Sequence, residues 1–223
     1  MSIPNTKYQI PNTLLYNWKI AGEAGYGIMN TGGPIFAKTL IRAGFFVFVY
    51  PEYPSLIRGG HNTMQVAVAK GPISGAYWQL HQLIALNTNA IIWHHDELQS
   101  GATVVYDSKL VGFRDDGSFN NDRIPALTGT VSIERACKKI FPRKDVTYIP
   151  CEFEAMAEKV GGNKIMKNVA SIGAALAVFC REIPHEADIL NIGKGVLADM
   201  FGKKGTAVVE ANQKVMEAGY NSI

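Results

Sequence analysis

Short apolar runs alternate along this chain with longer stretches in which apolar residues recur every three or four positions. The runs predict strands, at residues 16–21, 45–50, 63–69, 82–86, 103–107 and 146–150. The periodic stretches predict helices, at residues 36–43, 90–98, 131–140, 163–180, 187–200 and 206–218. This alternation favours an α/β fold: a Rossmann-like, open, mostly parallel sheet with helices on both faces.

The same pattern predicts where the domain begins and where its elements are interrupted. Residues 1–14 are polar, contain two prolines and have no period, so they predict an N-terminal arm before a single domain at residues 15–223. Pro34 predicts either a kink in the first helix or a second start there. The unbroken apolar run at residues 45–50 predicts a strand that is buried on both faces.

A glycine-rich turn follows the first predicted strand. Gly22, Gly25 and Gly27 stand where the strand should pass into the first helix. Glycine allows backbone amides to point outward at the positive end of a helix, where they can bind a phosphate or another anion. NAD binding is weakly supported, because Ala24 replaces the second glycine of the dinucleotide fingerprint and no acidic residue follows at the required spacing. The turn therefore predicts an anion site, with a purely structural tight turn as the alternative.

A second glycine-rich loop lies between two predicted strands and contains Arg58, Gly59 and Gly60. Arg58 could form a bidentate pair with a phosphate or carboxylate ligand, or a salt bridge with a neighbouring acidic residue. For His61, a hydrogen bond that orders the loop is the preferred interpretation over a ligand contact. Because ligands of α/β proteins bind at the carboxyl ends of the strands, this loop is a second candidate for the site.

Two further groups of polar residues lie on predicted helices. Lys167 and Asn168 stand near the start of the longest helix, where they could reach an anion or could form a solvated surface pair. Residues 94–97 have the sequence His-His-Asp-Glu, which resembles a set of metal ligands. Adjacent helical residues point about 100° apart and cannot converge on one ion. We therefore predict no metal site there.

Composition narrows the class of protein. The chain has 223 residues, of which 47% are hydrophobic and 18% charged, as expected of a globular domain. Its formal charge of +3 is spread along the chain, so it does not indicate nucleic-acid binding. No membrane span and no signal peptide is evident, which predicts a cytoplasmic location. A GxSxG motif, a P-loop and a CxxC pair are all missing, so no self-contained set of catalytic residues is predicted.

With these motifs, the chain resembles the gamma subunit, or gamma domain, of the 2-oxoacid:ferredoxin oxidoreductases that act on pyruvate, 2-oxoglutarate or ketoisovalerate. The resemblance is carried by residues 19–28, by residues 54–62 and by the helix that contains Lys167 and Asn168. It extends over residues 16–220. The last residues resemble the junction at which such domains continue into an alpha domain, so the chain is either a separate gene product or a fragment of a fusion.

The resemblance implies a noncatalytic component of a larger enzyme that converts a 2-oxoacid to an acyl-CoA and passes electrons to ferredoxin. Thiamine diphosphate and iron–sulfur clusters would belong to partner alpha and beta subunits, and this chain would help to bind coenzyme A. Isolated, it could also associate with itself. The residues expected near coenzyme A are Gly22, Gly25, Gly27, Arg58, Lys167 and Asn168.

Two other functions stay open at this point. One is a free-standing nucleotide-binding dehydrogenase, and the other is an assembly scaffold that binds no small molecule. Tyr26 departs from the family pattern in the glycine turn, where a glutamine is common, and Gly32-Gly33-Pro34 interrupts the first helix. These departures affect the expected contacts at the turn and the geometry of the helix, but not the expected fold.

Overall fold

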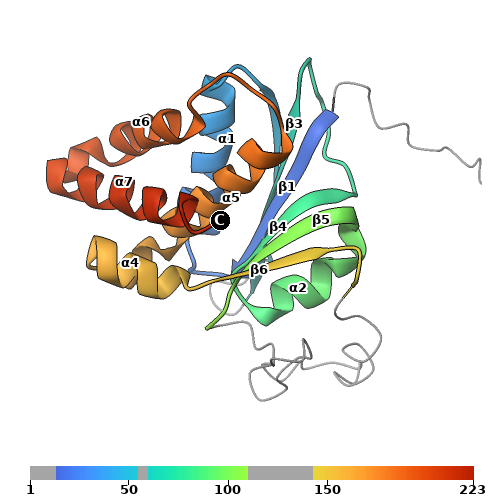
Figure 1. Ribbon diagram of the computed structural model, residues 1–223, viewed down its shortest axis with the longest axis horizontal. Helices are drawn as coiled ribbons and strands as arrows, with labels where there is room; N and C mark the ends of the chain where they lie inside the picture. Colours follow the sequence, from blue (N-terminus) through green and yellow to red (C-terminus); the bar gives the residue numbers. More distant parts are fainter. Residues whose placement is uncertain (1–13, 55–59, 110–142) are drawn as a thin grey trace, which may run out of the picture.

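A six-stranded sheet forms the centre of the computed structural model, which describes residues 14–54, 60–109 and 143–223 (Figure 1). The strand order is β2-β3-β1-β4-β5-β6. The strands are β1 (Leu14–Glu23), β2 (Phe46–Glu52), β3 (His61–Ala69), β4 (Leu80–Ala85), β5 (Leu98–Asp107) and β6 (Thr147–Cys151). Strands β1, β4, β5 and β6 are parallel, whereas β3 pairs antiparallel with β1 and β2. The mostly parallel sheet is confirmed, with an antiparallel extension at one edge.

Helices cover both faces of the sheet, as predicted, but unequally. Five of the described helices lie on one face, and α2 lies on the other (Figure 1). The helices are α1 (Gly33–Arg42), α2 (Thr88–His94), α4 (Phe153–Gly161), α5 (Lys167–Glu182), α6 (Ile189–Phe201) and α7 (Thr206–Tyr220). The helix expected at residues 131–140 lies outside the described residues.

The central strand β1 explains why both faces are covered. Tyr16, Trp18 and Ile20 are fully buried against the larger helical layer, where the Trp18 ring stacks on Phe36 of α1 at a centroid distance of 4.1 Å. Ala21 belongs instead to a smaller core beneath α2. Alternate residues of a strand point to opposite faces. A strand with apolar residues on both faces therefore needs a helix on each side.

The first helix begins in two steps. A π-helical turn (Ile28–Gly32) precedes α1, which has Pro34 in its first turn. Proline is tolerated there because the amide hydrogen that it lacks would have no acceptor within the helix. The second start that the sequence predicts at Pro34 is confirmed.

The prediction of a fully buried strand at residues 45–50 is wrong. β2 is an edge strand of the described sheet, and the side chains of Phe46, Val49 and Tyr50 are 46%, 37% and 45% exposed. An apolar run indicates that side chains favour burial, but not that this chain supplies the layer that buries them. The described structure therefore carries an exposed apolar edge.

Two helix predictions also change. No predicted helix corresponds to α4, a helix of nine residues in which Phe153 and Ala157 are buried. The long helix starts at Lys167 rather than at residue 163, because a 3-10 turn (Lys164–Met166) comes first. This boundary matters because it places Lys167 and Asn168 in the first turn of α5.

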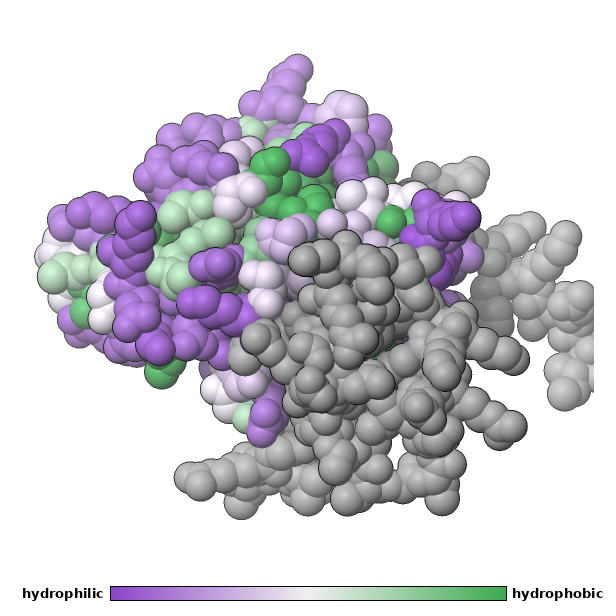
Figure 2. Space-filling view, turned by 60° about the horizontal axis from the view of Figure 1, so that its bottom comes forward, coloured by the Kyte–Doolittle hydropathy of each residue, from purple (hydrophilic) through white to green (hydrophobic). Residues whose placement is uncertain are grey.

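The outside of the larger helical layer has the character of a water-exposed surface. Figure 2 shows mainly hydrophilic side chains on its left side, which contains α4, α6 and α7, with apolar side chains in smaller patches. Of the helices within the described ranges, none has the combined length and apolar character needed to cross a membrane.

Candidate functional site

The glycine turn is a tight reversal at the end of β1. The amide of Tyr26 donates to the carbonyl of Glu23 at 3.1 Å. Gly25 and Gly27 have φ values of +99° and +74°, which side chains rarely adopt. Gly27 also caps the π-helical turn (Ile28–Gly32), whose first turn contains no acidic residue. The turn thus ends at a helix start that carries no negative side chain of its own.

Gly22 serves a different purpose, which is close packing. A Cβ atom at this position would lie 2.9 Å from the Cβ of Leu86, which follows β4. The Leu86 amide donates to the carbonyl of Ala21 at 3.0 Å, so the two parallel strands stay paired up to the turn. A side chain at residue 22 would force these strand ends apart.

The second glycine-rich loop meets the first. The amide of Ala24 donates to the carbonyl of Gly60 at 2.7 Å, and Glu23 is paired with His61 in the antiparallel register of β1 and β3. Arg58 lies outside the described residues. The structure therefore places the end of the Arg58 loop beside the glycine turn, while the role of Arg58 stays a prediction.

The start of α5 lies directly against the glycine turn. A Cβ atom on Gly27 would lie 2.3 Å from Nδ2 of Asn168, so a larger residue at this positive φ would have to displace the Asn168 amide. Asn168 is 4% exposed, and its Oδ1 atom is buried without a hydrogen-bond partner among the described residues. The Lys167 ammonium lies 3.9 Å from the centre of the Tyr26 ring. Thus Asn168 lies beneath the turn, while Lys167 lies over Tyr26, the residue that departs from the family pattern.

The charges around this edge have both signs. Lys164 in the turn before α5 forms an ion pair with Glu154 of α4, at 3.1 Å. Burial raises the pKa of Tyr26, and the nearby carboxylates of Glu23, Asp107 and Glu154 raise it further. The Tyr26 phenol is therefore neutral and can donate a hydrogen bond. Lys167 and the glycine turn thus lie at an edge that also carries carboxylates.

A second polar cluster lies on the α2 face of the sheet, and sequence reasoning missed it. The Lys19 ammonium contacts Glu97 at 2.5 Å, Glu97 contacts His94 Nδ1 at 2.7 Å, and the Nε2 atoms of His94 and His61 are 2.8 Å apart. We call these four residues the ionic chain. The one signal of this cluster in the sequence is Lys19, a lysine in the middle of an apolar strand. In the structure this side chain is only 3% exposed.

Two of the side chains in the His-His-Asp-Glu motif at residues 94–97, His94 and Glu97, belong to the ionic chain. His95 turns away to Asp96 and the carbonyl of Ile92. Within the described part of the chain, no three His, Cys, Asp or Glu side chains converge as metal ligands. Burial favours a raised pKa for Glu97, but hydrogen bonds and charges from His94 and Lys19 outweigh it and lower that pKa. For His61, the hydrogen bond at the start of β3 agrees with the preferred interpretation.

The ionic chain predicts a loss of stability in acid. Burial and the neighbouring His94 and Lys19 lower the pKa of His61 to about 3. The unfolded chain protonates this imidazole below about pH 6.5, whereas the folded protein keeps it neutral, so the free energy of unfolding should fall between these values as pH falls. This group contributes a slope of at most about 1.4 kcal/mol per pH unit. The His61→Gln variant should have a smaller slope in urea titrations between pH 7 and 4.5.

His185→Gln is the control for this pH experiment. His185 donates a hydrogen bond from Nδ1 to the carbonyl of Ile183, away from the ionic chain. An unchanged slope in His61→Gln, or an equal decrease in both variants, would contradict the assignment.

The fold and the first site together define a class of protein. It is an α/β domain with a glycine turn at the carboxyl ends of its parallel strands, the edge at which such domains bind ligands. The chain belongs to the pyruvate ferredoxin/flavodoxin oxidoreductase family, because the model of this family matches residues 17–222. The family expected from the sequence motifs is confirmed by this match.

A curated relative is the 2-oxoacid:ferredoxin oxidoreductase subunit alpha of a Sulfolobus species, which is 20% identical over 221 residues. The match covers 92% of this chain and 34% of the relative, so the chain spans about a third of the length of the curated relatives it matches. This chain is only 19–20% identical to these relatives.

Two solved structures have the same fold. The gamma subunit of a keto/oxoacid ferredoxin oxidoreductase from Geobacter sulfurreducens matches with a TM-score of 0.64 at 20% identity, over 93% of this chain and 98% of that one. The 2-oxoglutarate:ferredoxin oxidoreductase of Magnetococcus marinus matches with a TM-score of 0.69 at 23% identity, over 94% of this chain and 31% of that one. The latter structure holds 2-oxoglutarate, coenzyme A and succinyl-CoA.

Proposed function

We propose that this chain is the gamma component of a multisubunit 2-oxoacid:ferredoxin oxidoreductase and that its glycine edge helps to bind coenzyme A. The observation that carries the proposal is the meeting of the glycine turn with the start of α5. The contact between Gly27 and Asn168 joins two segments more than a hundred residues apart in the chain. The family match and the coenzyme A in the Magnetococcus structure support the choice of ligand.

The chemistry of coenzyme A suits this edge. Its phosphates need backbone amides and cations, which the turn at Gly25 and Gly27 and the Lys167 ammonium provide. In this proposal Asn168 supports the turn from below, and Arg58 completes the site from the neighbouring loop. The chain would act by position, because holding a thiol substrate beside the reacting acyl group raises its effective concentration.

The remaining chemistry would lie in the partners. In the proposed complex, alpha and beta subunits hold thiamine diphosphate and iron–sulfur clusters, and ferredoxin accepts the electrons. The complete enzyme would convert a 2-oxoacid to an acyl-CoA. A cytoplasmic location is proposed with it, because ferredoxin and coenzyme A would have to reach the same complex.

A titration with coenzyme A tests the site. Lys167→Ala should weaken binding of coenzyme A to the purified chain, or to the complex with its alpha and beta subunits, by about tenfold, because one charge-assisted contact to a phosphate is lost. Isothermal calorimetry measures the dissociation constant. Lys38→Ala is the matched control, because Lys38 is an exposed lysine of α1. This variant should bind coenzyme A with the affinity of the original chain.

The same titration separates the alternatives. Equal affinity in Lys167→Ala and Lys38→Ala would remove Lys167 from the site. Saturable binding of NAD or NADP without coenzyme A would favour the free-standing dehydrogenase. An absence of binding by either cofactor, in the chain and in the complex, would favour the assembly scaffold.

A further inference from the structure

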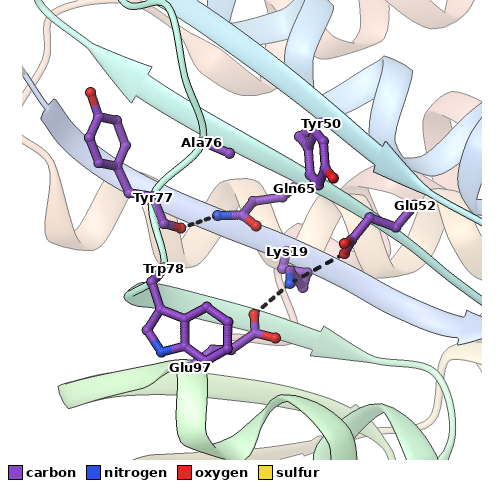
Figure 3. A pocket seen from close by; sticks show the side chains of 8 residues that line it. All are labelled: Lys19, Tyr50, Glu52, Gln65, Ala76, Tyr77, Trp78 and Glu97. Atoms are coloured by element: carbon purple, nitrogen blue, oxygen red, sulfur yellow. Dashed lines mark hydrogen bonds and ion pairs between the residues drawn. The ribbon is translucent and has the colours of Figure 1, made fainter. Parts of the chain in front are cut away.

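A cavity on the α2 face of the sheet lies next to the ionic chain and apart from the glycine turn. It measures about 210 Å³ and is lined in part by Lys19, Tyr50, Glu52 and Trp78 (Figure 3). This volume is about seven times the roughly 30 Å³ that one water occupies in the liquid. The cavity can therefore receive the end of a long side chain.

Two carboxylates, Glu52 and Glu97, and one ammonium, Lys19, line the cavity. The Lys19 ammonium lies 2.5 Å from Glu97 but 3.9 Å from Glu52, so its stronger partner is Glu97 (Figure 3). Among the described residues, Glu52 is held by the Thr63 hydroxyl, which donates to it at 3.0 Å, and by Lys19 at 3.9 Å. Its half-exposed carboxylate can therefore accept further hydrogen bonds from a ligand.

The chain holds Trp78 at the rim of this cavity. The Asn17 side-chain amide donates to the carbonyls of Tyr77 and Gln79, on both sides of Trp78, at 2.7 Å each. Gln65 also donates to the carbonyl of Tyr77. Trp78 is nevertheless 69% exposed. A tryptophan whose backbone is fixed on both sides loses little entropy on binding, which is typical of an interaction hot spot.

More aromatic side chains surround Glu52. A second cavity of about 450 Å³ is lined by Glu52, Tyr53 and Trp93, so Glu52 borders both cavities. Tyr53 and Trp93 are 69% and 48% exposed, and Tyr50 of the apolar edge strand is 45% exposed. An exposed aromatic surface around one carboxylate is larger than a small ion needs and fits a protein partner.

We propose that the cavity between Glu52 and Trp78 is the binding site for an arginine side chain of a different polypeptide chain, which docks on this aromatic surface. A guanidinium group can pair with the Glu52 carboxylate through two hydrogen bonds and can stack on the rings of Tyr50 and Trp78. A lysine ammonium is a point charge that cannot form this two-pronged pair with the carboxylate, and it stacks less well on aromatic rings. The half-exposed Glu52 carboxylate and its aromatic rim therefore favour a planar cation.

Peptide titration of the full chain tests this proposal. The probe is acetyl-glycyl-arginyl-glycinamide, and the same peptide with citrulline is the uncharged control of equal shape. NMR of the nitrogen-15-labelled chain follows the indole N–H of Trp78. The arginine peptide should shift this signal saturably, with an affinity at least about tenfold higher than that of the citrulline peptide.

Two variants assign the effect to the cavity. Glu52→Gln should weaken binding of the arginine peptide by about tenfold, whereas Glu186→Gln, at an exposed glutamate outside the cavity, should leave it unchanged. Trp78→Ala, followed through the Trp93 indole, should also weaken it. Glu52→Gln and Trp78→Ala should keep the coenzyme A affinity of the original chain, so failure of this proposal and failure of the proposed function are distinguishable.

Three results would overturn the proposal. The first is no saturable shift with the arginine peptide, and the second is equal binding of the citrulline peptide. The third is a dimer of this chain that Glu52→Gln abolishes, because the arginine would then come from a second copy rather than from a different chain.

Discussion

Lys19→Met is expected to destabilise the protein by about 3 to 5 kcal/mol, because it leaves the buried Glu97 carboxylate without its cation. Lys19 and Glu97 are 3% and 8% exposed, and their charged atoms lie 2.5 Å apart. Methionine nearly preserves the volume of the lysine stem, so loss of packing contributes little. Urea denaturation at pH 7 measures the change in the free energy of unfolding.

A double variant tests whether the loss of stability comes from the unpaired Glu97 charge rather than from the change of side chain at residue 19. Lys19→Met combined with Glu97→Gln removes both charges, while the glutamine oxygen can still accept from His94. It should recover a large part of the lost stability, since a neutral pair in place of a buried ion pair is often tolerated. Lys38→Met, at an exposed lysine of α1, is the control and should change stability by less than about 0.5 kcal/mol. A single Lys19→Met variant as stable as this control would contradict the assignment.

Gly173→Ala is expected to cost about 3 kcal/mol, because α5 and α7 cross in backbone contact. A Cβ atom on Gly173 would lie 2.0 Å from the carbonyl oxygen of Met216, and one on Gly219 would lie 2.0 Å from that of Ala170. Neither oxygen can move without shifting a helix. For a chain of this size, such a loss lowers the Tm by about 6 to 12 °C.

Gly195→Ala is the matched control for this experiment. Gly195 lies in α6, and a Cβ atom there would meet no described atom within 4 Å. Alanine favours the helix by about 0.5 to 1 kcal/mol over glycine, so this variant should be slightly more stable. Equal Tm values for the two variants would show that the helices do not cross as closely as described. Because α5 begins at Lys167 and Asn168, a shift at the crossing should also weaken binding of coenzyme A.

The sequence predicted most of the elements that position the candidate site. The strand before Gly22 and the helix after Gly32 follow from periodicity and from glycine and proline chemistry, which act over a few residues. The gathering of the glycine turn with Lys167 and Asn168 was expected only from the family resemblance. The contact between Gly27 and Asn168 depends on the packing of α5 against the sheet, which no local pattern encodes.

The two main errors concern β2 and α4. The apolar run at β2 was predicted to be buried on both faces, but its place at the sheet edge exposes Phe46 and Tyr50. The helix α4 was missed although its apolar residues recur at helical spacing, because it is only nine residues long and closely follows β6. Periodicity reports which side chains favour burial, while strand order decides which of them another element covers.

By itself, the sequence determined the alternation of strands and helices, the tight glycine turn and the family. These depend on backbone conformation and on side-chain patterns among neighbouring residues. Only the tertiary structure decided that Lys19 meets Glu97, that His94 meets His61, and that Glu52 lies among exposed aromatic rings. Lys19 and Glu97 are 78 residues apart, and buried charges are stable only where strand pairing and helix packing bring their partners within reach.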